Sequence, residues 1–376
     1  TLISTLGCQR FPCPTVDGTL HTDVGTALTC DMDEVVTTLI LTDDTKSSIT
    51  GLLPRFGDIT ELRLEYTTEL QTFPDEISQM KSLENLHIMG TQIVTIPKEI
   101  GDLNLTNLTI EHNVALYSIP PLQSPLETLT VQHNPNLNRL PKNLGSTESL
   151  RTLNLSHNGL KRLPQTLEKY SKIEALMLNN NQLKSLPDNI NGLENLQILN
   201  IQNNSITSLS LEFGELKQLI ELKLNNLPNL QEIVSLQGLE SLHYLSIVNC
   251  PELTKLPEDY SNVNSIEILN INNTALQGIP EQLIGKQTLR DVSIKRNQNL
   301  ERLPSEIGNA NQIENLHLNQ NELTDLPITL SNLSKLRSLL VDENEIRSWP
   351  EELCQFKELD ELSLSVNKVP EMCSNI

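Results

Sequence analysis

The sequence is poor in aromatic and in basic residues. Phe, Trp and Tyr together make up 3% of the 376 residues, so Leu, Ile and Val must supply most of the buried surface. Lys and Arg number 27 against 48 Asp and Glu, which gives a net charge of −21. Phosphate binding needs clustered Lys and Arg, so this balance argues against a nucleic-acid partner.

Long apolar runs and common active-site motifs are also missing from the sequence. No apolar stretch reaches the roughly 18 residues that would span a bilayer, so we expect no membrane span in this segment. A glycine-rich phosphate loop, HExxH, CxxC and GxSxG are absent. Catalysis needs a pocket with converging side chains, so we expect no enzyme and no cofactor. The chain starts at Thr1 without Met, as it would if a signal peptide had been removed.

A repeat of mostly 23 or 24 residues fills most of the chain. It follows LxxLxLxxNxLxxLPxxIxxLxx, and the pattern predicts fourteen full repeats over residues 36–358 and a truncated last repeat over 359–376. The repeats begin at Val36, Ile59, Leu83, Leu105, Leu126, Leu150, Ile173, Leu196, Leu219, Leu242, Ile266, Leu289, Ile313, Leu336 and Leu359.

The spacing within LRTLNLSHNGLKRLP (150–164) predicts a short strand followed by a turn. Leu153 and Leu155 are two residues apart and face the core, whereas Asn154 faces away from it. Asn158 follows at the turn, where a short amide side chain can satisfy both backbone N–H and C=O groups. Stacked repeats should place these turn asparagines in one ladder: Asn113, Asn134, Asn158, Asn181 and Asn204.

The ladder position shows departures from asparagine. Thr91 and Thr274 can still form a hydrogen bond there, and Cys250 should be a buried thiol. Leu227 cannot form one, so we expect a locally different turn around residues 225–230. Further along each repeat, proline follows an apolar residue, which suits a surface bend without a ladder partner.

These residues resemble the leucine-rich repeat family over about residues 36 to 370. The resemblance implies an α/β repeat solenoid, a curved horseshoe with a parallel β-sheet on its concave face. Turns and short helices would line its convex face. The LPxxI half of the repeat resembles that of bacterial, plant and protist proteins.

The cysteines are concentrated near the two ends of the chain. Residues 12–41 resemble the N-terminal cap of extracellular plant and protist leucine-rich repeat proteins, although the usual Trp is missing. We therefore expect a cap over residues 1–35, in which Cys30 pairs with Cys13 or alternatively with Cys8. Cys354 and Cys373 should form a disulfide that staples the C-terminal end. The alternative is a set of reduced cytosolic thiols.

Six N-x-[ST] sequons occur, at Asn104, Asn107, Asn154, Asn203, Asn272 and Asn332, about as many as random order gives. Four of them (Asn107, Asn154, Asn203 and Asn272) should point from the concave strands. Glycans there would obstruct that face, so we expect it to be free if it is the binding surface.

His112, His133 and His157 occupy the same place in three successive repeats. Neighbouring strands lie about 4.8 Å apart, so the three imidazoles should stack along one edge of the concave face. Such a group could hold zinc or act as a pH switch. Histidine and asparagine are also ordinary residues at this place, and we predict no metal site.

The outward strand positions predict a ligand-binding face. Its residues, with the three histidines, are Arg63, Glu65, Tyr66, His87, Glu111, Lys223, Tyr244, Asp291, Lys295 and Arg296. Binding energy concentrates in aromatic residues and arginine, so we expect Tyr66 with Arg63, and Tyr244 with Lys223, to be anchors. The alternative is a solvated polar face without a partner.

We therefore expect a non-enzymatic recognition or adhesion module, secreted or displayed at the cell surface, such as a receptor ectodomain. It would bind a protein or a glycan on its concave face. One alternative is an intracellular scaffold that resembles the Ras-associated repeat proteins. A second alternative is a structural or matrix protein. The sequence does not predict an oligomeric state.

Overall fold

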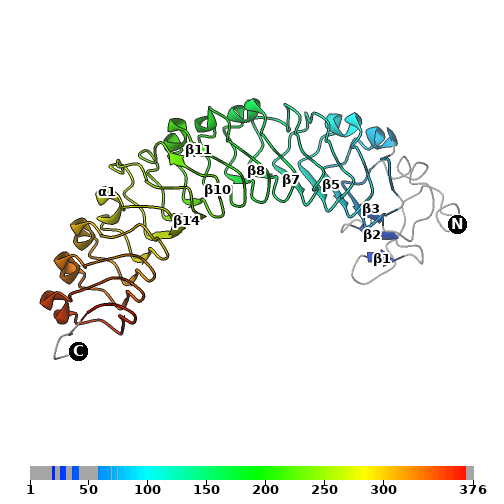
Figure 1. Cartoon of the computed structure of the whole chain (residues 1–376). Helices are drawn as coiled ribbons and strands as arrows, with labels where there is room; N and C mark the ends of the chain where they lie inside the picture. Colours follow the sequence, from blue (N-terminus) through cyan, green and yellow to red (C-terminus); the bar gives the residue numbers. More distant parts are fainter. Residues whose placement is uncertain are drawn as a thin grey trace. The chain divides into compact units, whose positions relative to one another are not determined.

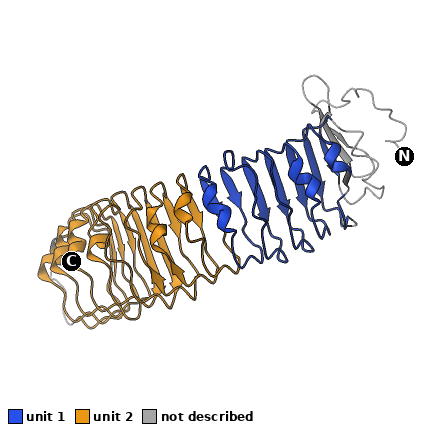
Figure 2. Cartoon of the chain, turned by 90° about the horizontal axis from the view of Figure 1, so that it is seen from above, with its two compact units in different colours: residues 1–177 blue, residues 178–376 orange. Residues whose placement is uncertain are grey.

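The computed structural model of the chain describes residues 19–21, 26–30, 36–41, 58–68, 70–73 and 75–369. The chain forms two compact units, residues 1–177 (unit 1) and residues 178–376 (unit 2), which Figure 2 colours separately. Cys8, Cys13 and Cys373 lie outside the described residues, so the disulfides expected there stay predictions. The predicted division into 1–35, 36–358 and 359–376 also stays a prediction.

Unit 1 is built around a parallel sheet to which each repeat contributes one strand (Figure 1). Its parallel strands are β3 (Val36–Leu41), β4 (Glu61–Glu65), β5 (Asn85–Met89), β6 (Asn107–Glu111), β7 (Thr128–Gln132), β8 (Thr152–Asn154) and β9 (Ala175–Met177). The 3-10 helices η3 (Asp75–Gln79), η4 (Lys98–Asp102) and η5 (Gln165–Lys169) lie on the side opposite the sheet. Before them, β1 (Thr19–His21) and β2 (Thr26–Cys30) pair antiparallel, and β2 pairs antiparallel with β3. The first parallel strand therefore has no open edge.

Unit 2 repeats the same arrangement. Its parallel strands are β10 (Ile198–Asn200), β12 (Glu221–Lys223), β14 (Tyr244–Cys250), β15 (Ile268–Thr274), β16 (Asp291–Ser293), β17 (Asn315–His317), β18 (Ser338–Leu340) and β19 (Glu361–Ser363). Opposite them lie η6 (Ile190–Gly192), η7 (Leu211–Glu215), α1 (Glu281–Ile284), η8 (Ser305–Asn309), η9 (Ile328–Asn332) and η10 (Glu351–Gln355). Strands β11 (Ser208–Leu209) and β13 (Glu232–Ile233) form a separate two-stranded parallel sheet. The predicted repeat solenoid with one strand per repeat is confirmed.

The core follows from the alternation of apolar and polar residues along each strand. In β4, Leu62 and Leu64 are fully buried, whereas the residues on either side of them are half-buried on the exposed sheet face. Leucine and isoleucine fill most of the interior of both units, as the scarcity of aromatics predicts. Among the largest fully buried side chains are Tyr170 in unit 1 and Phe213 and Tyr260 in unit 2.

Proline starts most of the short helices. Pro97, Pro164, Pro304, Pro327 and Pro350 precede η4, η5, η8, η9 and η10, with φ between −67° and −61°. A fixed φ and a missing N–H suit the residue directly before a helix, whose own N–H has no partner in that helix. The elements that follow these prolines are short 3-10 helices, and the surface bend expected at Pro164, Pro304 and Pro327 lies directly before one of them.

Candidate binding surfaces

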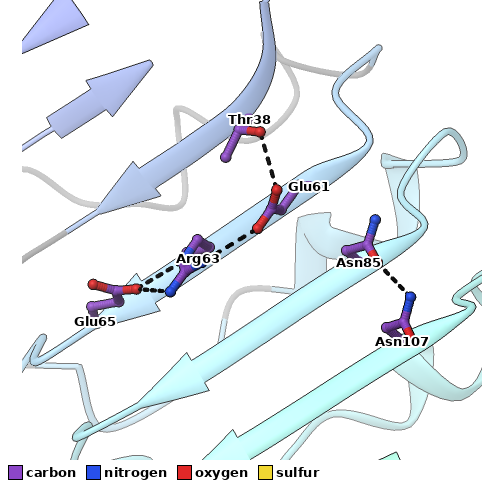
Figure 3. A network of polar contacts seen from close by, with 6 residues as sticks. All are labelled: Thr38, Glu61, Arg63, Glu65, Asn85 and Asn107. Carbon is purple, nitrogen blue, oxygen red and sulfur yellow. Dashed lines mark hydrogen bonds and ion pairs between the residues drawn. The ribbon is translucent and has the colours of Figure 1, made fainter. Parts of the chain in front are cut away.

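Each unit presents an exposed sheet face, which we define as the outward side chains of the parallel strands. In unit 1 this face carries Arg63, which is held by two carboxylates of its own strand (Figure 3). The Arg63 Nε donates to Glu65 Oε1 at 2.7 Å, and an Arg63 guanidinium nitrogen lies 3.6 Å from Glu61 Oε1. Thr38 on β3 donates to Glu61 at 3.2 Å. Arg63, predicted as a free anchor, is therefore already ion-paired within the protein.

Two further predicted residues flank this cluster. Tyr66 is 58% exposed, and its ring lies against Gly90 of the next repeat, where an added Cβ would come 2.7 Å from Tyr66 Cδ1. His87 is half-buried, and its Nε2 atom has no hydrogen-bond partner within the described chain. Burial lowers the pKa of His87, Arg63 lowers it further, and Glu111 raises it. His87 is therefore held towards its neutral form.

A column of residues with positive φ runs along one edge of the sheet in each unit. These residues directly precede the ladder position, and their φ angles lie between 52° and 64°. They are Tyr66, Gly90, His112, His133 and His157 in unit 1, and Asn180, Asn203, Asn226, Asn249, Asn273, Arg296, Gln320, Glu343 and Val366 in unit 2. This backbone conformation was not predicted from the sequence. The run of asparagine and histidine at these positions could have indicated it, because both residues tolerate the left-handed region better than most residues.

The three histidines of this left-handed column form a stack in unit 1. The ring centroids of His112 and His133 are 4.4 Å apart with an interplanar angle of 9°, and those of His133 and His157 are 4.1 Å apart at 16°. Burial lowers the pKa of His133, and His157 and His112 lower it further. The nitrogen lone pairs of parallel rings point in the same direction, whereas zinc needs ligands that converge. The part of the chain with described coordinates contains no group of His, Cys, Asp and Glu that could hold a metal ion.

The asparagine ladder lies behind this column. Asn134 Nδ2 donates to the carbonyls of Ile110 and Gln132 at 3.0 and 2.8 Å. Its side-chain oxygen accepts the backbone N–H of Asn113 at 3.0 Å, and Asn158 does the same for the N–H of Asn134 at 2.9 Å. Thr91 joins this series, because its N–H and its hydroxyl both donate to Asn113 Oδ1. Each buried amide thus closes its own turn and bonds the neighbouring repeats.

In unit 2 the same ladder includes Asn181, Asn204, Asn297, Asn321 and Asn344, all buried. Their side-chain amides donate to backbone carbonyls of their own strand or of the preceding repeat. The ladder asparagines are therefore buried, and their side-chain amides bond mainly to the backbone.

Cys250 and Leu227 occupy two ladder positions without an asparagine. The Cys250 thiol is fully buried and donates to the Leu224 carbonyl at 3.0 Å, as an asparagine amide does elsewhere. Burial raises the pKa of Cys250 to about 11, and a hydrogen bond from the Leu227 backbone opposes this shift. Asn226, just before Leu227, has the φ of its column, 55°, and Leu230 N–H bonds to the Leu227 carbonyl at 3.1 Å. The expected locally different turn at residues 225–230 is therefore wrong, because a buried leucine fills the space while the backbone stays the same.

The exposed sheet face of unit 2 contains the second predicted pair of anchors. Lys223 Nζ lies 5.5 Å from the centroid of the Tyr244 ring, within the range of a cation–π contact. Asn270 Nδ2 donates to the Tyr244 hydroxyl at 3.2 Å, and Lys223 also forms an ion pair with Glu221. Tyr244 is thus half-buried in a defined orientation.

The remaining predicted site residues of unit 2 lie further along the chain. Asp291 accepts a hydrogen bond from Asn315 Nδ2 at 2.5 Å, and the Lys295 backbone N–H donates to Asn272 at 2.8 Å. Arg296 lies in the left-handed column, beyond the end of β16, and its Nε donates to Gln320 at 2.7 Å. Lys295 and Arg296 both follow the end of β16, and of the two only Arg296 has the positive φ of the left-handed column.

The sequon asparagines on the sheet face take part in hydrogen bonds. Asn107 Nδ2 donates to Asn85 Oδ1 at 2.7 Å, and Asn154 Nδ2 donates to Gln132 Oε1 at 2.8 Å. Asn203 does not point from a strand as expected, because β10 ends at Asn200 and Asn203 lies in the left-handed column at the edge.

Comparison with known proteins agrees with this architecture. The family described as Leucine Rich Repeat matches residues 149–170 and 195–216. A leucine-rich repeat protein of Leptospira interrogans has 28% sequence identity and a TM-score of 0.60, and the match covers 90% of this chain and 90% of that chain. An internalin of Listeria monocytogenes has 20% identity and a TM-score of 0.55, with 89% of this chain and 82% of that chain covered. The Toll–Spätzle complex of Drosophila has 21% identity and a TM-score of 0.57, with 88% and 47% covered.

The fold is an α/β leucine-rich repeat solenoid, and these findings support a leucine-rich repeat family. A comparison with curated protein sequences finds no match. No helix in the described ranges has the length and apolar character needed to cross a membrane. The leucine-rich repeat fold supports a protein-binding repeat module.

Proposed function

We propose that this protein is a non-enzymatic recognition module that binds a protein partner through its exposed sheet face. The observation that carries the proposal is the cluster of Tyr244, Lys223 and Asn270 in unit 2. The Tyr244 ring has a lysine over it and a hydrogen-bonded hydroxyl, so its orientation is set before any partner arrives. A preorganised aromatic side chain loses little conformational entropy on binding, which makes it a good anchor.

Unit 1 supplies a second exposed aromatic beside a charged cluster. Tyr66 is 58% exposed and directly follows β4, the strand that carries the ion-paired Arg63 with Glu61 and Glu65. A cluster of mixed charge at an interface contributes more to the orientation and the choice of the protein partner than to the affinity for it. A chain that shares this fold was solved in the Toll–Spätzle complex, so a solenoid of this kind can form part of a protein complex.

We further propose that the module acts outside the cell, as a secreted or cell-surface protein. The support is the concentration of cysteines at the two ends of the chain, which predicts disulfide-closed caps. Intact-mass measurement of the unreduced, alkylated protein, with peptide mapping, tests this. A bridge between Cys354 and Cys373 is expected, whereas six alkylated thiols would favour the intracellular scaffold.

The binding proposal is tested by alanine variants of the two tyrosines. Surface and secreted proteins of the source organism are screened against the intact chain, and affinities for the partner found are measured. Tyr244→Ala should weaken binding at least tenfold and leave the melting temperature close to that of the wild type. Tyr117→Ala is the matched control, because Tyr117 is 44% exposed but lies away from the sheet strands. Unchanged affinity in a combined Tyr66→Ala and Tyr244→Ala variant would refute the assignment.

A further inference from the structure

A shallow groove of about 500 Å³ runs along one edge of the sheet in unit 2. Its lining includes Asn203, Asn226, Asn249, Asn273, Pro228 and Pro251, together with the ladder residues Asn181 and Asn204 and with Ser205. None of the residues that line it is charged, although the chain as a whole carries a net charge of −21. The groove is therefore an uncharged, amide-rich strip on an acidic protein.

The backbone fixes the four asparagines of this groove. All four belong to the left-handed column, with φ of 53°, 55°, 58° and 54° in chain order. Backbone N–H groups of these asparagines donate to carbonyls of the next repeat: Asn226 donates to the Val248 carbonyl at 2.7 Å, and Asn273 donates to the Lys295 carbonyl at 2.8 Å. Neighbouring repeats are spaced at about the 4.8 Å of paired strands, so the amides form a row at that interval.

Three side chains of this row are also bonded to one another. Asn249 Nδ2 donates to Asn226 Oδ1 at 2.6 Å, and Asn273 Nδ2 donates to Asn249 Oδ1 at 2.8 Å. A primary amide has two N–H donors and an oxygen with two lone pairs. Asn249 therefore keeps one N–H and one lone pair for a ligand after its contacts in the row. Because the row holds these groups in place, a ligand would lose little entropy in ordering them.

The chemistry of the row selects a class of ligand. A hydroxyl both donates and accepts, so two adjacent hydroxyls on a sugar ring complement the N–H and the oxygen of one amide. Pro228 and Pro251 are exposed and offer apolar surface to the C–H face of such a ring. A protein partner would need aromatic or arginine anchors, and an ionic ligand would need an opposite charge; the groove lining has neither.

We propose that this groove is a binding site for a neutral oligosaccharide, which would lie along Asn203, Asn226, Asn249 and Asn273. The site is separate from the proposed protein-binding face, since it shares no residue with the Tyr244 cluster. Loss of protein binding in Tyr244→Ala would leave sugar binding unchanged, so the two proposals fail independently.

Calorimetric titration of the full chain with cellohexaose, maltohexaose and chitohexaose tests the proposal. At least one of these neutral hexasaccharides should bind with a millimolar or tighter Kd. An Asn226→Gly and Asn249→Gly double variant should bind at least tenfold more weakly, because it removes two amides while glycine keeps the positive φ. Gln320→Gly is the matched control: Gln320 has φ of 61° in the same column but does not line the groove.

Three results would overturn the proposal. The first is the absence of binding by all three sugars, and the second is equal binding by the double variant when its melting curve shows a folded protein. The third is tighter binding of a neutral Gly-Ser peptide than of any sugar, which would make the groove a polypeptide site. Asn203 also begins a sequon, so peptide mapping must show that it carries no covalent glycan, which would fill the groove.

Discussion

The side-chain oxygen of Asn134 accepts the backbone N–H of Asn113, 21 residues earlier in the chain, at 3.0 Å. The same amide donates to the carbonyls of Ile110 and Gln132. One buried side chain therefore satisfies three backbone groups in two repeats. No other residue type of this size offers both two donors and an acceptor.

Replacing this asparagine should be costly. Asn134→Ala would leave buried backbone groups without partners, and we expect it to lower the free energy of unfolding of the protein by about 3 kcal/mol. Chemical denaturation followed by circular dichroism measures the change. Asn136→Ala is the control, because Asn136 is exposed and donates only to the Val114 carbonyl. Equal effects of the two substitutions would contradict the role given to Asn134.

Gly90 combines a left-handed backbone with a close approach to an aromatic ring. Its φ is 64°, and a Cβ there would come 2.7 Å from the Tyr66 ring. Gly90→Ala should destabilise the protein by about 1 to 2 kcal/mol, mainly through the left-handed backbone. Gly278→Ala should be close to neutral, since nothing lies within 4 Å of a Cβ at that position. Comparing the two melting temperatures tests the prediction, and similar melting temperatures would count against it.

The histidine stack should make stability depend on pH. The folded-state pKa of His133 lies below its ordinary value of 6.5, so the unfolded chain takes up a proton first as the pH falls. Stability should therefore be fully present above about pH 6.5 and decline as the pH falls towards the folded-state pKa. NMR titration of the His133 ring and denaturation curves between about pH 7.5 and about pH 5 measure both effects.

His133→Asn should reduce this pH dependence while keeping the backbone, because asparagine occupies the same column in five repeats of unit 2. His243→Asn is the control, since His243 lies outside the stack and bonds to the Ser241 carbonyl. An unaltered pH profile in His133→Asn would show that protonation of His133 does not cause the pH dependence of stability.

Cys250 should be inert in the folded protein. Its thiol is fully buried and its pKa is raised to about 11, so about one molecule in a thousand carries the thiolate at pH 8. Maleimide labelling with peptide mapping should find this residue unmodified until denaturant is added. Rapid labelling of Cys250 under native conditions would mean that this turn opens far more readily than its packing indicates.

Replacing the thiol with an amide should stabilise the protein. Cys250→Asn restores the ladder residue, which can accept the Leu227 N–H and donate to the Leu224 carbonyl as the other asparagines do. We expect a gain of about 1 kcal/mol in the free energy of unfolding. Cys250→Ala is the control, and it should lose stability because it removes the existing bond to Leu224.

The sequence predicted the features that repeat strictly. Strand phase could be read from the spacing of Leu62 and Leu64, because burial of one strand face forces a period of two. Stacking of His133 on its neighbours followed from equal positions in adjacent repeats. Features that depend on the geometry of individual side chains could not be predicted from the sequence: Arg63 forms ion pairs within its own strand, and Leu227 replaces an amide without altering the turn.

The left-handed column shows where the sequence signal was present but ambiguous. Asn249 precedes a ladder position. The sequence alone does not show whether asparagine is present there because its side chain forms hydrogen bonds or because its backbone tolerates a positive φ. The structure shows both: a φ of 58° and a side chain bonded to Asn226 and Asn273. The groove depends on the hydrogen bonds of this side chain to its neighbours, and the sequence does not predict them.

The ladder also determines which changes in chain length the protein can accept. Most ladder amides bond to their own turn and to the repeat before it, so their contacts follow one pattern along each unit. Duplication or loss of one whole repeat would recreate these contacts and would keep the repeat pattern of the sequence. Insertion of a single residue between a strand and its ladder asparagine would instead move the amide off its carbonyls. Natural variation in this protein should therefore come in steps of 21 to 24 residues, the observed spacing of its repeats.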